Sequence, residues 1–198
     1  MTFNCMIAGV GGQGTVLASK LIAAAAMSRG YSVRTTETIG MAQRGGSVVS
    51  HVRIGENIFS PLIPLAAADA LIAFEPAEAV RQLPYLSEGG LLIVCDSAIP
   101  PVTDPRSGTV YEAAPMIGFL KENVKRLAVI DGGQLTTLNA KTLNIALLGA
   151  AAESGIFPFD GEVFKGLIPE MLHERFLEMN LKAFEKGRMV YHEYTRKN

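Results

Sequence analysis

Cysteine is scarce in this sequence, since only Cys5 and Cys95 occur among its 198 residues. Each lies in an apolar stretch that is typical of a strand, so we expect two buried, free thiols of the kind found in reducing compartments. Two cysteines are too few to hold an iron–sulfur cluster with four thiolate ligands. The chain by itself is therefore not expected to carry such a cluster.

Long apolar runs and basic runs are also missing. No apolar run approaches the roughly 20 residues needed to span a bilayer, and residues 1–5 show no basic segment ahead of a long apolar one. We therefore expect no membrane insertion, no signal peptide and a cytoplasmic location. The net charge is -1 and Lys and Arg form no cluster, so nucleic acid is not an expected partner.

Several catalytic signatures are absent as well. There is no phosphate-binding P-loop pattern and no serine, histidine and aspartate order with a nucleophile elbow. His51, His173 and His192 have no metal-ligand spacing, so we predict neither a metal site nor a catalytic residue in this chain. Asp96 and Asp131 follow predicted strands, where ligand contacts occur in α/β proteins, but they suit helix caps and turns equally well.

What the sequence does contain is apolar residues in alternating strand and helix patterns. Apolar residues make up 48% and charged residues 19%, which favours a sheet buried on both faces or a surface covered by another subunit. Strands are predicted at 4–9, 31–36, 47–54, 69–74, 91–96 and 126–130, and helices at 15–29, 76–83, 114–123, 140–153, 161–171 and 173–194.

This alternation predicts one α/β domain over residues 1–198. We expect a Rossmann-like, three-layer α/β/α sandwich with a mostly parallel sheet, and the strands at 4–9 and 31–36 should run parallel. The segment 47–54 alternates in polarity, which indicates an irregular or antiparallel edge of the sheet.

The first glycine-rich motif is Gly9–Gly14 (GVGGQG), between a predicted strand and a predicted helix. It has the G-x-G-x-x-G spacing of dinucleotide-binding loops, in which glycines let the backbone approach a phosphate and the helix N-terminus offers N–H donors. Gln13 adds an amide. The motif predicts a ligand-binding loop that includes Gly11, Gly12, Gln13 and Gly14, and the alternative is a tight turn without a ligand.

A second glycine-containing loop follows the predicted strand at 31–36 and contains Gln43, Arg44 and Gly45. A guanidinium fork and an amide suit a carboxylate, a phosphate or a partner's backbone. The alternative is a connector in which Arg44 is solvated or pairs with Glu37. Glu37 also lies near the place of the acidic residue in a dinucleotide site, so NAD or FAD stays open, although an ordinary nucleotide-binding half continues here with a helix.

Together, the motifs at 9–14 and 43–47 (QRGGS), their separation, the strand 48–54 and the segments 69–71 and 144–149 resemble the gamma subunit or domain of 2-oxoacid:ferredoxin oxidoreductases. The resemblance extends to 180–184 and so covers nearly the full length. Within the family the chain is most similar to the beta subunit of the indolepyruvate type, in which this domain is a separate polypeptide.

The resemblance implies an accessory subunit that is inactive alone, in a complex that oxidatively decarboxylates a 2-oxoacid, here an arylpyruvate, to an acyl-coenzyme A. Thiamine diphosphate, Mg²⁺ and [4Fe–4S] clusters would belong to a larger partner subunit, and electrons would pass through the complex to ferredoxin. The two glycine loops would face coenzyme A or the partner. Without the partner, exposed apolar surface favours a homodimer.

Two other readings stay open at this point. The glycine fingerprint alone is compatible with a stand-alone oxidoreductase domain that binds NAD or FAD, although no substrate domain is evident. The third reading is a non-catalytic scaffold subunit whose glycine loops serve only packing.

Overall fold

The computed structural model describes residues 2–40, 45–100, 111–136 and 140–197. Its centre is a six-stranded sheet with the order β2-β3-β1-β4-β5-β6. The strands are β1 (Phe3–Val10), β2 (Val33–Ile39), β3 (Ser47–Ile54), β4 (Ala68–Ala73), β5 (Leu86–Cys95) and β6 (Arg126–Ile130). β1, β4, β5 and β6 pair in parallel, whereas β3 pairs antiparallel with both β1 and β2.

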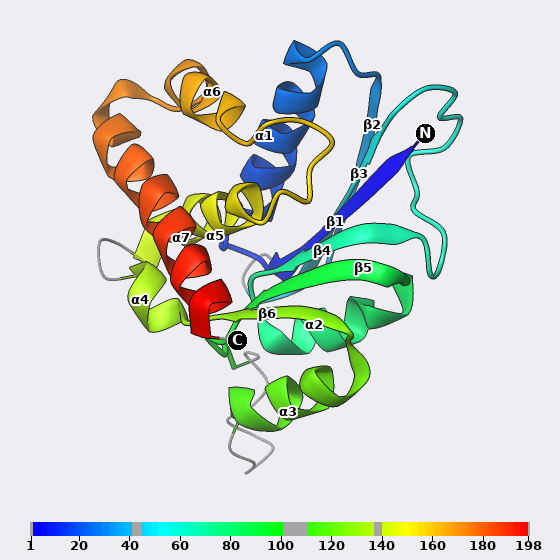
Figure 1. Ribbon diagram of the computed structural model, residues 1–198, viewed down its shortest axis with the longest axis vertical. Helices are drawn as coiled ribbons and strands as arrows, with labels where there is room; N and C mark the ends of the chain where they lie inside the picture. Colours follow the sequence, from blue (N-terminus) through cyan, green and yellow to red (C-terminus); the bar gives the residue numbers. More distant parts are fainter. Residues whose placement is uncertain (1, 41–44, 101–110, 137–139, 198) are drawn as a thin grey trace.

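Helices cover both faces of this sheet, as Figure 1 shows. One face carries α1 (Thr15–Ser28), α4 (Gly132–Thr136), α5 (Leu143–Glu153), α6 (Val163–Met171) and α7 (Leu177–Lys197), and the other carries α2 (Pro76–Gln82) and α3 (Ala113–Asn123). Short 3-10 turns occupy Leu83–Tyr85, Ala140–Thr142 and Glu174–Phe176. The predicted three-layer α/β/α sandwich with a mostly parallel sheet is confirmed.

The predicted antiparallel portion is also confirmed, with one difference in placement. β3 lies one position inside the sheet and β2 forms the edge. β1 and β2 are both antiparallel to β3, so they run parallel to each other as predicted, but they are not neighbours. The strand–helix–strand unit at the N-terminus is therefore split by a strand that comes later in the chain.

Strand β5 begins at Leu86, before the predicted start at residue 91. The sequence pattern suggested a break because Gly89 and Gly90 precede the apolar run. In the structure these glycines belong to the strand, where the register with β4 shifts between Ala68 and Ala70. A side chain at Gly90 would place its Cβ 2.6 Å from the Ala68 carbonyl oxygen, so the close approach of the two strands requires glycine.

Two apolar clusters fill the spaces between the sheet and its helices. Cys5 and Cys95 are free and buried in the cluster beneath α1 and α5, which confirms that expectation. Burial raises the pKa of both thiols, since the interior disfavours a thiolate. Neither is therefore poised to act as a nucleophile or a metal ligand. No helix in the described part of the chain has the length and apolarity to cross a membrane.

The segment 55–67 covers part of the sheet face that carries α2 and α3, and side chains of β3 hold this segment in place. Arg53 donates from Nη1 to the carbonyl oxygen of Ser60 at 2.9 Å and from Nε to Asn4 Oδ1 at 2.9 Å. His51 Nδ1 accepts from the buried Ile63 N–H at 3.2 Å. Phe59, which is 95% exposed, lies on the outer side of this otherwise well-anchored segment.

Helices α5 and α7 cross at two glycines that face each other's backbone. A Cβ at Gly187 of α7 would overlap the Ala146 carbonyl oxygen of α5, and a Cβ at Gly149 would overlap the Phe184 carbonyl oxygen. The helices are therefore closer than ordinary side chains permit, and this contact fixes α7 on the domain.

We expect Gly187→Ala to lower the free energy of unfolding by roughly 1–3 kcal/mol, because the added methyl group meets backbone that cannot move aside. Urea denaturation of the purified chain measures this loss. Gly118→Ala is the matched control, since Gly118 lies within α3 with open space around its Cβ position. The control should gain about 0.5–1 kcal/mol from its higher helix propensity, and an equal loss in both variants would contradict the crossing.

His51 should make stability depend on pH. Burial lowers the pKa of His51 from its ordinary value of 6.5, so the unfolded chain binds more protons at acid pH than the folded chain. This contribution to the free energy of unfolding is complete above pH 6.5. It is lost as the pH falls from 6.5 through the lower pKa that His51 has in the folded chain. Urea midpoints should drop less from about pH 7.5 to about pH 5.5 in His51→Gln than in the wild-type chain.

The exposed His192 supplies the control for this measurement, because its side chain is 63% exposed. His192→Gln should leave in place the drop in urea midpoint that His51 produces. Identical pH profiles for His51→Gln and the wild-type chain would refute the assignment.

Candidate functional site

A pocket lies at the carboxyl edge of the parallel strands, where chain segments that are distant in sequence meet. Its volume is about 410 Å³, and the lining residues are Val10, Gly11, Gly12, Gln13, Gly45, Ser97, Ile99, Lys141 and Leu143. The walls thus come from the loop after β1, the start of β3, the segment after β5 and the start of α5. Such an edge is where open α/β sheets bind their ligands.

Four of the seven residues predicted as a binding site line this pocket, namely Gly11, Gly12, Gln13 and Gly45. Gly14 follows directly as the N-cap of α1. Gln43 and Arg44 lie outside the described residues, so their predicted role stays a prediction. Lys141, Ser97 and Ile99 were not predicted, because nothing in the sequence places 97–99 or 141 beside the glycine loop.

The glycine loop needs its glycines for two separate reasons. Gly12 and Gly14 have φ angles of 100° and 79°, in the region that favours glycine. A Cβ at Gly9 would lie 2.8 Å from Gln13 Oε1 and 2.9 Å from the Thr15 methyl group. The motif therefore encodes a tight turn at the positions 12 and 14 and close packing at the position 9.

Gln13 braces this turn from inside the chain. Its Oε1 accepts from the Val10 N–H at 2.8 Å, and its Nε2 donates to the Phe74 carbonyl oxygen at 3.0 Å. The amide thus ties the glycine loop to the end of β4. The sequence suggested Gln13 as a ligand contact, and in the structure both ends of its amide already bind backbone groups, so its clearest role is to shape the pocket wall.

Where the second glycine-containing loop joins β3, backbone hydrogen bonds connect it to the first glycine loop and close it on itself. The Gly11 N–H donates to the Gly46 carbonyl oxygen at 2.8 Å, and the Gly40 N–H donates to the Ser47 carbonyl oxygen at 2.8 Å. Gly45, with a φ of 73°, turns the chain into β3 beside the pocket. The two glycine motifs of the sequence therefore meet directly in space.

The electrostatics of the pocket favour an anion. α1 begins at Thr15, so one helix N-terminus with its orphan N–H groups and partial positive charge lies at this edge, next to the 3-10 turn Ala140–Thr142 that leads into α5. Asn144 links the starts of α1 and α5, since its Nδ2 donates to the Gly14 carbonyl oxygen at 3.3 Å. Among the described lining residues, Lys141 is the one that carries a charge.

Two buried carboxylates stand behind the glycine loops, at the start of α2, and sequence reasoning missed both. Glu75 and Glu78 are each 1% exposed. Glu75 accepts from Tyr111 Oη at 2.6 Å, and Glu78 accepts from Ser47 Oγ at 2.6 Å and pairs with Arg81. Burial and the hydrogen bond to Glu75 raise the pKa of Tyr111, which keeps the phenol protonated as a donor.

The other polar candidates from the sequence have structural partners. Asp96 Oδ1 accepts from the Gly132 N–H at 2.8 Å, and Asp131 Oδ1 accepts from the Gln134 N–H at 3.1 Å. Both thus act as turn and cap residues. The histidines are not grouped, and in the described part of the chain no three His, Cys, Asp or Glu side chains are arranged to hold a metal ion.

The place of Glu37 argues against an ordinary dinucleotide site. Glu37 lies on β2 and accepts from Ser19 Oγ of α1 at 3.2 Å. Because β3 separates β2 from β1, Glu37 stands two strand spacings from the glycine strand, about 10 Å, rather than beside it. An acidic side chain in that position is displaced from where a ribose would lie next to the glycine loop.

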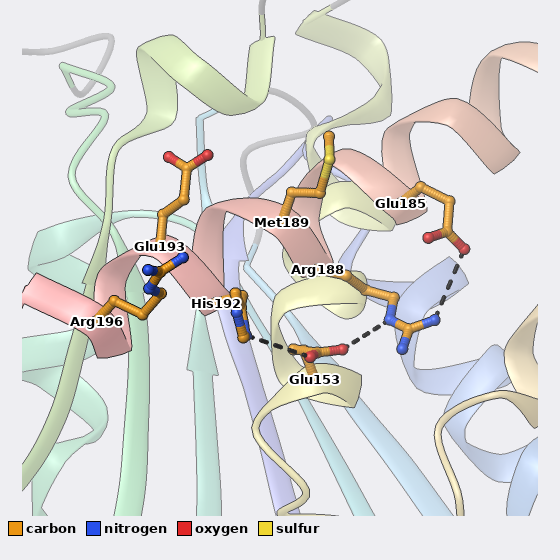
Figure 2. A pocket seen from close by; sticks show the side chains of 7 residues that line it. All are labelled: Glu153, Glu185, Arg188, Met189, His192, Glu193 and Arg196. Atoms are coloured by element: carbon orange, nitrogen blue, oxygen red, sulfur yellow. Dashed lines mark hydrogen bonds and ion pairs between the residues drawn. The ribbon is translucent and has the colours of Figure 1, made fainter.

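A second cavity, of about 480 Å³, is formed over α5 and α7 (Figure 2). Its charged groups pair with each other: Arg188 Nε lies 2.8 Å from Glu153 Oε2, its Nη1 lies 3.8 Å from Glu185 Oε1, and His192 Nδ1 lies 4.0 Å from Glu153 Oε1. Surface ion pairs of this kind contribute little and need no ligand. The glycine-loop pocket is therefore the candidate site.

Comparison with known proteins points to one family. The model for pyruvate ferredoxin/flavodoxin oxidoreductase matches residues 4–190. The chain belongs to this family. It is 35% identical over 195 residues to the indolepyruvate oxidoreductase subunit IorB of Pyrococcus horikoshii, with 93% of this chain and 94% of that protein covered.

Solved structures share the fold. A keto/oxoacid ferredoxin oxidoreductase gamma subunit from Geobacter sulfurreducens superposes with a TM-score of 0.69 at 21% identity, covering 98% of each chain. A 2-oxoglutarate:ferredoxin oxidoreductase from Magnetococcus marinus, with 2-oxoglutarate, coenzyme A and succinyl-CoA bound, gives a TM-score of 0.71 at 21% identity. There 97% of this chain matches 31% of a longer polypeptide. The resemblance seen in the sequence, to a gamma-type subunit, is confirmed.

The brace formed by Gln13 can be tested by an isosteric change. Gln13→Glu keeps an oxygen near the Val10 N–H but turns an oxygen toward the Phe74 carbonyl group in place of the donor. We expect a loss of about 1–3 kcal/mol in the free energy of unfolding, measured by urea denaturation. Gln13→Ala, which removes both bonds, provides the comparison. Wild-type stability of Gln13→Glu would contradict the brace.

Proposed function

We propose that the chain is the accessory subunit of an indolepyruvate:ferredoxin oxidoreductase, in which its glycine-loop pocket contacts coenzyme A. The coarser assignment, an accessory subunit of an oxidoreductase complex of the 2-oxoacid:ferredoxin type, follows from family membership. Indolepyruvate as the substrate is supported by the similarity to the indolepyruvate oxidoreductase subunit of Pyrococcus horikoshii. The expected reaction converts an arylpyruvate to an aryl-acetyl-coenzyme A and carbon dioxide.

The observation that carries the coenzyme A contact is the charge of the pocket. The N-terminus of α1 and Lys141 suit the diphosphate of coenzyme A, because backbone N–H groups and a lysine are common phosphate donors. The apolar walls formed by Val10, Ile99 and Leu143 suit an uncharged arm next to it. A volume of about 410 Å³ holds part of such a ligand, so the partner subunit would cover the remainder.

Thiamine diphosphate, Mg²⁺ and iron–sulfur clusters are proposed to lie on the larger partner subunit. The thiols of Cys5 and Cys95 are buried in an apolar cluster and do not suit an exposed redox centre. What this chain contributes is binding and orientation: its glycine loops present backbone donors and Lys141 presents a charge. Ferredoxin would receive electrons through the complex, and this chain alone would not turn over.

An interface with the partner is supported by apolar side chains on the surface. Phe59, Leu62 and Leu65 are 95%, 55% and 66% exposed, and they lie together on the anchored segment 55–67. Exposed apolar groups of this kind typically mark a protein contact. In the absence of the partner the same surface would favour a homodimer. We place the complex in the cytoplasm.

The test uses the complex of this chain with its larger subunit under anaerobic conditions. Viologen reduction is followed with indolepyruvate and coenzyme A, for the wild-type chain and for Lys141→Ala. We expect the KM for coenzyme A to rise roughly tenfold in Lys141→Ala, since one charge-assisted contact to a phosphate is lost, with kcat within about twofold. The KM for indolepyruvate should stay unchanged.

Lys121→Ala is the matched control, because Lys121 is an exposed lysine on α3, away from the pocket. Full activity of the larger subunit without this chain would contradict the accessory role. An unchanged KM in Lys141→Ala would contradict the coenzyme A contact. Yellow protein, or a thermal shift with NAD, would favour a dinucleotide-binding domain, and activity that survives every loop variant would favour a scaffold.

A further inference from the structure

The five residues Phe74–Glu78, at the junction of β4 and α2, contact the glycine loop, the start of β3 and Tyr111. Phe74 accepts from Gln13 of the glycine loop. Glu75 accepts from Tyr111, and Glu78 accepts from Ser47. Phe74 is itself held to β1, since its N–H donates to the Ala8 carbonyl oxygen at 2.8 Å. One short junction thus binds parts of the chain that are distant from it in sequence, and Gln13 and Phe74 alone are 61 residues apart.

We propose that Glu78 is a positioning residue, which holds Ser47 so that the start of β3 takes its place against the glycine loop. The effect on coenzyme A rests on the proposed function. The effect on the loop geometry does not, because it concerns contacts within this chain alone.

Glu78 affects the pocket through its contact with Ser47. Ser47 is the first residue of β3 and pairs with Val10, the last residue of β1. The preceding residue, Gly46, accepts the hydrogen bond from the Gly11 N–H. A carboxylate that fixes the Ser47 hydroxyl group therefore also fixes the distance between the two glycine loops.

Glu75 connects Glu78 to Tyr111, the first residue of the described range 111–136. The Tyr111 hydroxyl group donates to Glu75 Oε1 at 2.6 Å, while Glu75 Oε2 accepts from the Glu78 N–H at 3.0 Å. One carboxylate therefore caps α2 at the Glu78 N–H and binds Tyr111, and so helps to place Glu78 for its contact with Ser47.

The burial of both carboxylates needs a reason beyond the stability of α2. α2 has only seven residues and requires one N-cap, which Glu75 supplies. Burying a second carboxylate in an apolar setting is costly unless specific partners bind it. Ser47 and Arg81 bind Glu78, and the Ser47 contact is the one that reaches the pocket.

The first readout is amide hydrogen exchange of Gly11 in the isolated full chain, followed in a peptide that covers 9–14. Ser47→Ala and Glu78→Gln should each speed this exchange about tenfold, since the Gly11 bond to Gly46 loses its support. Ser47→Thr keeps a hydroxyl group and should restore slow exchange. Glu88→Gln is the control, because Glu88 is an exposed glutamate near the start of β5.

The second readout is kinetic and uses the complex with the larger subunit. Ser47→Ala should raise the KM for coenzyme A about five- to tenfold, with kcat within about twofold. Ser47→Thr should again be close to the wild-type complex. Ser47→Ala removes only one oxygen, so it tests the proposal even if Glu78→Gln does not fold.

The two readouts separate this inference from the proposed function. Wild-type exchange of Gly11 in folded Ser47→Ala would overturn the positioning role of Glu78. An unchanged KM in Ser47→Ala, in a complex whose Lys141→Ala variant has a raised KM, would overturn the effect of Glu78 on coenzyme A binding. If Lys141→Ala leaves the KM unchanged, the coenzyme A contact fails, and the exchange of Gly11 still decides the role of Glu78.

Discussion

Strand β3 runs antiparallel between β1 and β2, and the register pairs Val10 with Ser47. This one pairing brings the two glycine motifs together, because each motif is attached to an end of the paired strands at the same edge. The hydrogen bond from the Gly11 N–H to the Gly46 carbonyl oxygen completes the contact. The pocket, the brace by Gln13 and the contact of Ser47 with Glu78 all depend on this placement of β3.

The same pairing changes what the glycine fingerprint means. In a dinucleotide-binding fold the second strand lies beside the glycine strand and presents an acidic residue to the ribose. Here an antiparallel strand takes that position, and Glu37 instead binds Ser19 of α1. The glycine loop retains the properties that suit a phosphate, namely close backbone approach and a helix N-terminus, while the neighbouring wall comes from Gly45 and the start of β3.

The charged side chains of this protein differ in how deeply they are buried. The carboxylates of Glu75 and Glu78 are buried with specific partners, whereas the side chains of Arg188 and Glu153, which form an ion pair over α5 and α7, stay 25% and 27% exposed. Thiols are buried and unsuited to redox chemistry. These features agree with a subunit that shapes and presents a ligand site, and that depends on a partner for electron transfer.

Local pattern determined most of the secondary structure and the fold class. Buried apolar runs, helical periodicity and the G-x-G-x-x-G spacing are local signals, so the strand at Arg126–Ile130 and the glycine turn at Gly12 and Gly14 follow from neighbouring residues alone. The start of β5 was missed because a glycine pair reads locally as a break, although in the sheet it permits a close strand contact.

Only the tertiary structure decided the order of the strands and therefore the composition of the pocket. Which strand pairs with β1 depends on contacts between residues that are far apart in sequence, such as Gly9 with Val48 and Ala8 with Ala73. Lys141, Glu75 and Glu78 carry no local signal of function, since their roles come from partners distant in sequence. The sequence determined the segments that form the site, and the pairing of distant strands brought these segments together.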